Sequence, residues 1–468
     1  MKSLKLLTIC GATLMLVACT KDDVTTTASF EELKATQPTP VAFSTYLGES
    51  TTTRAAIDTD VALQTAGFGV FAYYTDDKKY PNTKDAGTGT TASWTGDNAL
   101  TPNFMYNQRV SYSSGWTYAP IKYWPNDFNG ANQAVDARTS GTAATGSKAN
   151  YLSFFAYAPY ATPSGSETNG IKAFSANTAH TDPIVTYTMG ATSSTDFVDL
   201  LWGVYNGTGN VKNVLNNNND GGIVQYTDGI TKDGKANVNI NLQKQYTDGA
   251  VGFSFKHALA KLGNITVDAI VDQGTLDNTK TIITVSSVSI TSSVNNEGTL
   301  NLATGVWTTT GSASPFALNF GSAVGNITIN QHITDPSDFG NTYLEDTGTD
   351  GIEDSWKSGT PTVTTTAQDL ASAAPFVVFI PDTKPSFNVS ITYKVRTADQ
   401  ALSAKYTDVE QTISKSISFA NAFEMNKIYN LAIHLGLTSV KFTATVENWD
   451  TANPVSQSVD LPINVASN

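Results

Sequence analysis

Cysteine is nearly absent from this chain. The two cysteines, Cys10 and Cys19, both lie within the first twenty residues. The remainder of the sequence therefore has no disulfide framework and no cysteine-based metal site. The histidines are also few, and they form no ligand pair at helical spacing: His180, His257, His332 and His434.

Charge is scarce as well. Asp, Glu, Lys and Arg together make up 15% of the 468 residues, and the formal net charge is −13. No basic cluster occurs anywhere, and arginine is found only at four positions: Arg54, Arg109, Arg138 and Arg396. An acidic chain without a basic cluster does not suit a phosphate backbone, which excludes nucleic acid as a partner.

β-Branched, aromatic and turn-forming residues are abundant instead. Short strand-like runs alternate with Gly, Asn and Pro clusters from Pro40 onward, for example at 67–75, 151–157 and 387–395. This pattern predicts an all-β chain of antiparallel sandwiches. Helical patterns are rare. His257–Leu262 (HALAKL) is the best candidate for a short helix, and an irregular turn fits it equally well.

The N-terminus has the pattern of an export signal. Two lysines precede the apolar run Leu6–Val17, which is too short to span a membrane. The run ends in Leu-Val-Ala-Cys19, which resembles a bacterial lipobox; an ordinary signal peptide with an incidental cysteine is the alternative. We expect a signal peptide at 1–18 and a lipidated tether at 19–40. More than one acyl chain on Cys19, palmitate among them, would anchor the protein to a membrane stably.

Motifs for catalysis or metal binding fail on inspection. Gly229–Lys235 fits the spacing of a phosphate-binding loop, but Ala236 replaces the required hydroxyl residue. The acidic segment 335–356 partly matches the pattern of a calcium-binding loop, but Gly348 stands at a ligand position and Lys357 replaces the closing Glu. The sequence leaves open whether this segment binds Ca²⁺ adventitiously. We therefore expect no enzymatic activity and no cofactor.

The segment Trp116–Pro125 concentrates aromatic residues. If its side chains are exposed, Trp116 and Trp124 could stack on sugar rings and bind glycans. If they are buried, they would close one end of a sandwich, which the rigid turn made by the prolines favours. Both interpretations stay open at the level of sequence.

Several segments together resemble the fimbrillin family, the lipoprotein-derived subunits of type V pili. The resemblance runs from the lipobox nearly to the C-terminus and is carried by short motifs: Phe43–Tyr46, Thr53–Ala55, Phe68–Tyr73, Asn103–Gln108, Trp116–Pro125, Phe154–Tyr160, Asp199–Trp202, Phe253–Leu262 and Thr443–Trp449. It implies two transthyretin-like β-sandwich domains, which we place at 41–245 and 246–468. It also implies cleavage by an arginine-directed protease in an early loop, followed by donor-strand exchange.

The residues can be matched to that scheme. Cleavage between Arg54 and Ala55, in the loop 48–56, would remove the lipid anchor together with the strand 41–47. The inward face of that strand is expected to consist of four residues: Val41, Phe43, Thr45 and Leu47. A donor strand within the C-terminal segment 455–468 would offer a matching face: Val459, Leu461, Ile463 and Val465.

One residue disturbs this assignment. Pro462 lies inside the proposed donor strand and has no N–H to give to a ladder. Either the strand is bonded on one side only at that point, or its register lies closer to Val455. Alternatively, 459–465 is simply the last strand of its own domain, and Arg54 is a solvated connector residue.

The function expected from all this is a structural pilus subunit that serves adhesion. It would be exported to the outer membrane as a surface-exposed lipoprotein and would assemble into a fimbrium with copies of itself or related subunits. A tip or accessory subunit is one alternative. Another is a monomeric, surface-anchored glycan-binding lipoprotein that uses Trp116 and Trp124. The sequence does not identify the receptor.

Overall fold

The structure is a computed structural model of the whole chain. It divides into two compact units, Met1–Pro38 and Thr39–Asn468. The described residues all belong to the second unit: 39–47, 57–76, 101–125, 151–190, 197–205, 239–242, 250–269, 281–320, 327–331, 342–345, 355–358, 368–370, 377–381, 384–399, 401–403, 406–419, 421–435, 440–449, 459–460 and 463–465. The predicted signal peptide, Cys19 and the loop 48–56 with Arg54 and Ala55 lie outside them.

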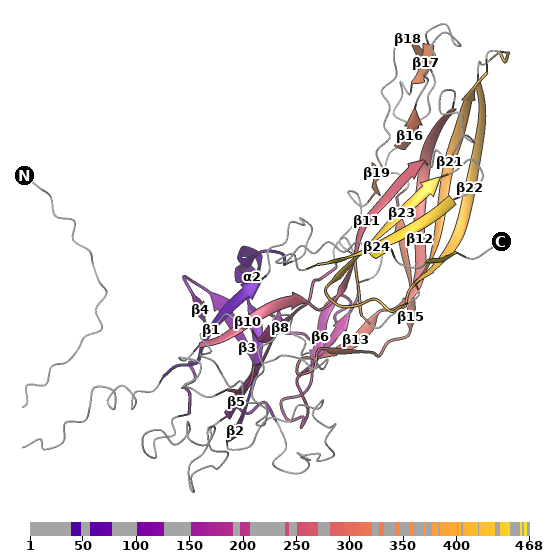
Figure 1. Cartoon of the computed structure of the whole chain (residues 1–468). Helices are drawn as coiled ribbons and strands as arrows, with labels where there is room; N and C mark the ends of the chain where they lie inside the picture. The colour runs from indigo at the N-terminus through magenta and orange to yellow at the C-terminus, as the bar shows by residue number, and fades with distance from the viewer. Residues whose placement is uncertain are drawn as a thin grey trace, which may run out of the picture. The chain divides into compact units, whose positions relative to one another are not determined.

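Strands between residues 42 and 257 form an eight-stranded sheet (Figure 1). Its order is β1-β10-β8-β5-β2-β3-β4, and β9 pairs with β5. Its pairs are antiparallel except for β1 and β10, which run parallel. The strands are β1 (Ala42–Leu47), β2 (Phe68–Asp76), β3 (Met105–Tyr112), β4 (Trp116–Thr117), β5 (Tyr151–Ala158), β8 (Leu201–Tyr205), β9 (Asn239–Leu242) and β10 (Ala250–His257).

A four-stranded sheet in the order β14-β13-β7-β6 joins distant parts of the sequence. It pairs β6 (Gly170–Phe174) and β7 (Ile184–Thr188) with β13 (Glu297–Asn301) and β14 (Val306–Thr309). Strands β10, β13 and β14 all lie after residue 246, where the sequence predicts the second domain to begin. Of these, β10 pairs with β1 and β8 and β13 pairs with β7, all strands from the first half of the chain, and β14 pairs with β13.

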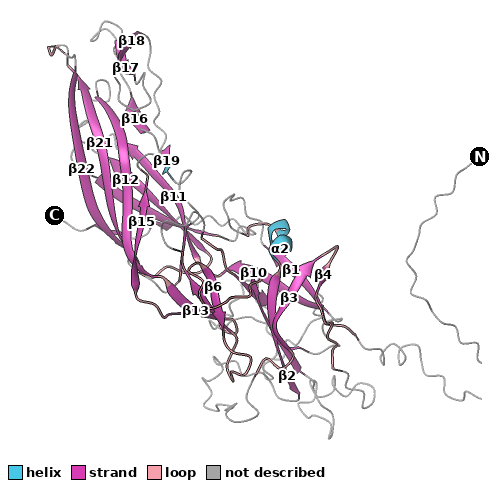
Figure 2. Ribbon diagram, turned by 180° about the vertical axis from the view of Figure 1, so that it is seen from behind, coloured by secondary structure: helices cyan, strands magenta, loops and turns pink. Residues whose placement is uncertain are grey.

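The remaining strands form two six-stranded sheets and a hairpin (Figures 1 and 2). The first sheet contains β11 (Ala260–Ala269), β19 (Gln368–Asp369), β20 (Val377–Phe379), β23 (Lys427–Leu435), β24 (Val440–Asn448) and β25 (Val459–Asp460). The second contains β12 (Thr281–Asn295), β15 (Ala313–Asn319), β16 (Ile327–Gln331), β21 (Ser386–Ala398), β22 (Tyr406–Phe419) and β26 (Ile463–Val465). The hairpin pairs β17 (Thr342–Glu345) with β18 (Ser355–Ser358).

The buried side chains fall into two clusters. One cluster lies on the face of the eight-stranded sheet that includes Phe43, Phe154 and Phe253. The other joins the opposite face of β2 and β5 to the four-stranded and six-stranded sheets. Because successive side chains of a strand point to opposite faces, β2 and β5 contribute to both clusters and read as continuous apolar runs. The all-β, multi-sandwich fold predicted from the sequence is confirmed.

One helix occurs among the described residues, and it is not where the sequence placed the best candidate. Helix α2 (Asp60–Ala66) begins after Thr59, whose hydroxyl accepts a hydrogen bond from the Ala62 N–H. It ends at Gly67, whose φ of 64° favours glycine. Of the two interpretations of His257–Leu262, the helix is wrong. His257 ends β10 and Ala260 begins β11, so that only Ala258 and Leu259 lie between the two strands.

Candidate functional site

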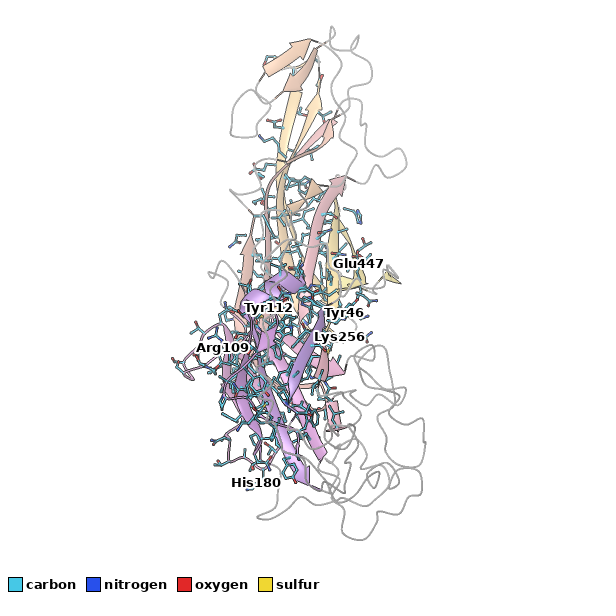
Figure 3. The ribbon with its side chains drawn as sticks, turned by 90° about the vertical axis from the view of Figure 1, so that its left-hand side faces the viewer. Tyr46, Arg109, Tyr112, His180, Lys256 and Glu447 are labelled. Carbon is cyan, nitrogen blue, oxygen red and sulfur yellow. The ribbon has the colours of Figure 1, made fainter. Side chains whose placement is uncertain are left out.

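Strand β1 is an edge strand whose inward face is buried. It pairs with β10 through six consecutive residues, from Ala42 with Ala250 to Leu47 with Phe255. Val41 and Leu47 are buried and Thr45 is half-buried, whereas Tyr46 points outward and is 45% exposed (Figure 3). The alternation in the sequence thus corresponds to an inner and an outer face.

Phe43 is the centre of this face. Its ring contacts four other rings at centroid distances of 5.4 to 6.0 Å, from strands β2, β5 and β10 and from the segment after β4: Phe68, Tyr118, Phe154 and Phe253. Removing β1 would therefore leave a groove lined mainly by aromatic side chains.

The second wall of this groove is the segment 116–124, which we call the aromatic strap. The Trp116 indole Nε1–H donates to the Thr45 hydroxyl at 2.9 Å. The Tyr118 hydroxyl donates to the Val41 carbonyl at 2.8 Å. Burial raises the pKa of Tyr118, so its hydroxyl keeps the proton that it donates.

The strap also pairs through its backbone with residues 39–41, which directly precede β1. The Val41 N–H donates to the Lys122 carbonyl at 2.8 Å, and the Trp124 N–H donates to the Thr39 carbonyl at 2.9 Å. An isolated antiparallel bridge joins Pro40 and Tyr123. The segment 39–47 is therefore held from both sides: β10 pairs along β1, and the strap bonds to residues 39–41 and to Thr45.

These contacts decide between the two interpretations of the strap. Trp124 is only 2% exposed and packs edge-on against Phe154, with ring centroids 5.8 Å apart. Trp116 is half-buried and lies 4.9 Å from the Phe68 ring. The packing interpretation is the one that the structure shows. Trp124 has no free face for a sugar ring.

The C-terminal segment divides between two sheets. Strand β25 pairs through Val459 and Asp460 with β24, and β26 pairs through residues 463–465 with β22. Leu461 and Pro462 separate these two strands and lie outside the described residues, as do the side chains of 459–465. Within one chain, the predicted donor segment thus forms two short ladders at the edges of its own sheets.

The predicted cleavage loop connects two buried points. Leu47, at the end of β1, is 6% exposed, and Ile57, after the loop, is 9% exposed. Both belong to the same hydrophobic cluster as Phe43. The structure therefore brings together the ends of the loop, β1 and the strap, whereas the C-terminal segment pairs in other sheets. The sequence pattern showed the aromatic strap but gave no sign of its hydrogen bonds to β1.

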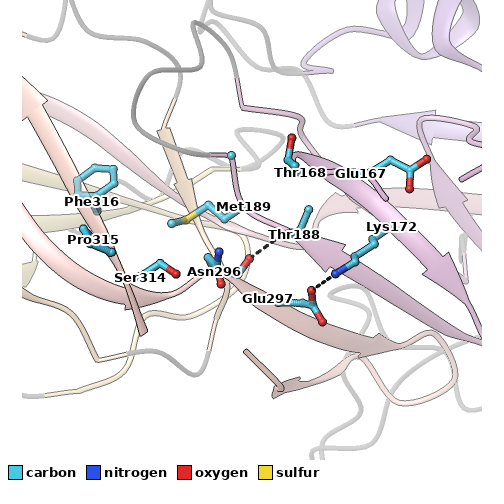
Figure 4. A pocket seen from close by; sticks show the side chains of 11 residues that line it. Glu167, Thr168, Lys172, Thr188, Met189, Asn296, Glu297, Ser314, Pro315 and Phe316 are labelled. Atoms are coloured by element: carbon cyan, nitrogen blue, oxygen red, sulfur yellow. Dashed lines mark hydrogen bonds and ion pairs between the residues drawn. The ribbon is translucent and has the colours of Figure 1, made fainter. Parts of the chain in front are cut away.

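A separate cavity of about 370 Å³ lies between β7, β13 and β15 (Figure 4). An ion pair between Lys172 and Glu297 crosses one side of it, with 2.5 Å between Nζ and Oε2. Met189 and Phe316 line the other side. Among the described residues, no group of three or more His, Cys, Asp or Glu side chains is placed to hold a metal ion. The described part of the chain also contains no helix that is long and apolar enough to cross a membrane.

With the fold and the position of β1 described, the chain can be compared with known proteins. Residues 236–449 match the family model described as fimbrillin-like. The resemblance to fimbrillins predicted from the sequence is thereby confirmed.

The chain is also similar to individual fimbrial proteins. The chain is 24% identical over 276 residues to the fimbrium subunit Fim1C of Phocaeicola vulgatus; the match covers 58% of this chain and 53% of Fim1C, about half its length. The crystal structure of a fimbrial protein from Bacteroides vulgatus superposes with a TM-score of 0.52 at 19% identity, covering 88% of this chain and 99% of that one. This second likeness shows the shared fold.

Proposed function

We propose that this chain is a stalk subunit of a cell-surface fimbrium that serves adhesion and assembles by donor-strand exchange. The precursor is exported as a lipoprotein anchored in the outer membrane through Cys19. Cleavage between Arg54 and Ala55 then releases strand β1, and the C-terminal segment of a neighbouring subunit fills the vacated groove. The role is structural, needs no cofactor and involves copies of this chain or related subunits as partners.

The observation that carries this proposal is the position of β1. It is the only described strand that precedes the loop 48–56, and it lies at the edge of its sheet while its inner face completes a buried cluster. A single cut in the loop leaves β1 joined to the rest of the subunit by noncovalent contacts alone. The cut therefore produces a detachable strand and an apolar groove at one step.

The chain supplies a segment of matching pattern and length for that groove. Val459, Leu461, Ile463 and Val465 alternate as Val41, Phe43, Thr45 and Leu47 do. Burying about four such side chains contributes roughly 6–12 kcal/mol gross, an upper bound because the free segment and open groove already hide some surface. Backbone pairing with the groove walls adds the hydrogen bonds of strand addition.

Pro462 sets a condition on the register of the exchange. In the single chain, β25 ends at Asp460 and β26 begins at Ile463, so no described ladder bond needs an N–H from residue 462. In the groove, we place Pro462 where its nitrogen faces away from β10, because a strand can tolerate proline on a side that makes no ladder bond.

The proposal is tested at Arg54. We expect Arg54→Ala to fold normally, to keep its lipidated N-terminus at Cys19 and to form no ladder of oligomers on a mildly heated denaturing gel. Thr52→Ala, in the same loop, is the matched control and should mature like the unmodified protein. N-terminal sequencing of the surface protein should begin at Ala55. Unmodified surface protein that still carries Cys19 and runs only as a monomer would overturn the proposal.

A further inference from the structure

A buried charge cluster surrounds His257 at the end of β10. The imidazole Nδ1 lies 2.9 Å from Oδ2 of Asp199, and Nε2 lies 3.4 Å from Oδ1 of Asp58. The Trp449 ring stacks on the imidazole, with centroids 3.8 Å apart and planes at 3°. None of these four side chains is more than 4% exposed. Buried charged side chains are rare in proteins unless they are paired, because burying an unpaired charge is costly. The pairing of His257 with both aspartates meets this condition.

The imidazole and the two carboxylates of the cluster attract one another. Burial works to lower the pKa of His257, but the attraction and hydrogen bond of Asp199 and the contacts with Asp58 outweigh it and raise the pKa to about 9. The imidazole is therefore charged at neutral pH. Two further groups face the cluster: the Lys261 ammonium, 5.3 Å from the Trp449 ring centroid, and Tyr187, whose pKa is raised by burial and by Asp199.

The members come from parts of the chain that are far apart in sequence. His257 and Trp449 belong to two of the motifs that carry the resemblance to fimbrillins, Phe253–Leu262 and Thr443–Trp449. His257 ends β10 of the eight-stranded sheet, and Trp449 follows β24 of a six-stranded sheet. The cluster therefore ties these two sheets together where β10 passes into β11.

The cluster also holds a third part of the molecule, the residues just after the cleavage loop. Asp58 contacts His257, and the Ile57 N–H donates to Oδ2 of Asp199 at 3.0 Å. The next element, α2, has seven residues and buries only Leu63. A helix this short is not stable alone, and one of the strands that it contacts is β1. When β1 leaves, α2 loses that support, whereas the contacts of Ile57 and Asp58 remain.

We infer that Asp58, Asp199, His257 and Trp449 form a clasp that keeps the new N-terminal segment in place after maturation. The clasp makes cleavage release β1 and nothing downstream of it, so that residues 57–66 stay ordered beside the open groove. His257 is a positioning residue: it acts on the segment through Asp58 and on the groove only indirectly. This inference rests on the proposed cleavage at Arg54.

The experiment compares the full chain with Asp58→Asn and with Asp60→Asn, a matched control two residues away whose carboxylate is exposed. Each protein is treated with an arginine-specific endoprotease, and mass spectrometry records whether Arg54 is cut. Hydrogen exchange of the amides at 57–66 is measured before and after the cut. We expect protection of this segment to survive cleavage in the unmodified and Asp60→Asn chains, and exchange to become at least tenfold faster in cut Asp58→Asn.

Loss of protection in the cut unmodified chain would overturn the clasp, as would full protection in cut Asp58→Asn. If Arg54 is not cut at all, the proposed maturation fails instead. The clasp is then decided on the uncut chain, where Asp58→Asn must still speed the exchange of the Ile57 amide tenfold relative to Asp60→Asn.

A pH profile separates the clasp from simple packing. The pKa of His257 is raised above its unfolded value of 6.5, so its contribution to stability is complete below about pH 6.5 and is lost as the pH rises through 9. The melting temperature of the unmodified chain should therefore fall across this range. His257→Gln should flatten that fall, whereas His434→Gln, on β23, should leave it unchanged. An unchanged slope in a folded His257→Gln chain would overturn the charged clasp; if that variant does not fold, the same slope is read in Asp58→Asn.

Discussion

The two end segments of the folded chain are seated in opposite ways. Strand β1 makes six consecutive residue pairs with β10, is bonded to the aromatic strap on its other side and places Phe43 among four rings. The C-terminal segment makes two residue pairs with β24 and three with β22. Strand β1 is thus one continuous, enclosed strand, whereas the C-terminal segment is divided between the edges of two sheets.

The difference indicates how the ends exchange. A strand held on both sides leaves slowly, because its contacts must break together, and while the loop is uncut the strand stays tethered and rebinds. Short ladders at sheet edges open at low cost, since local stability follows the number of buried contacts and protected hydrogen bonds. The enclosed end is therefore suited to being a placeholder, and the divided end to being a donor.

The largest effect should come from deleting residues 455–468. This removes β25 and β26 and, with them, the proposed donor. We expect the oligomer ladder on a mildly heated gel to disappear completely, while the monomer still unfolds cooperatively in urea, because only five residue pairs are lost. Deleting 466–468 is the control, since it leaves both strands, and should preserve the ladder. A truncated chain that fails to fold would instead make 459–465 the last strand of its own domain.

Phe43→Ala should destabilise the uncut precursor by about 3–5 kcal/mol, because the residue is 7% exposed and its ring leaves a cavity among four others. Urea unfolding of the Arg54→Ala chain, which stays uncut, measures this loss. Tyr46→Ala is the matched control on the outer face and should cost about 0.5 kcal/mol or less. Mature polymers should be unaffected by either change, since both residues have departed; weakened polymers would show that β1 stays in the fibre.

The sequence was sufficient for the elements governed by local pattern. Alternation predicted the inner face of β1, and strand-like runs at 67–75, 151–157 and 387–395 predicted β2, β5 and β21. Alternation cannot show pairing between distant segments, however. A shift in composition before Val251 suggested a domain boundary at 245/246, but β10 pairs with β8 and β1, and β13 pairs with β7.

In the candidate site, too, local sequence pattern could not reveal features that depend on contacts between distant segments. A short helix at HALAKL was a reasonable expectation from local propensity, yet long-range pairing with Lys427–Tyr429 and Val377–Phe379 keeps Ala260–Leu262 extended. Helix α2 was missed because its seven residues give less than two turns of periodicity, and its cap Thr59 is one threonine in a Thr-rich region. Asp58 gave no signal in the sequence, and Asp199 stood out only as the first residue of the motif Asp199–Trp202. Their contact with His257 could not be predicted, since only the fold brings the three residues together.

The smallest effect should come from the bond between the strap and β1. Thr45→Val keeps the shape of the side chain but removes the acceptor of the Trp116 indole N–H, and it should cost about 0.5–1.5 kcal/mol in the uncut chain. Ser44→Ala, on the exposed face, is the control and should cost less. Combining Thr45→Val with Trp116→Phe gives a double-mutant cycle, whose coupling energy we expect near 1 kcal/mol. A coupling of zero would mean that the strap holds β1 by packing and backbone bonds alone, so an incoming donor strand would need no hydroxyl at this position. A clear coupling would make the hydroxyl at 45 one feature by which the groove distinguishes β1 from its replacement, because the proposed donor face has only apolar residues.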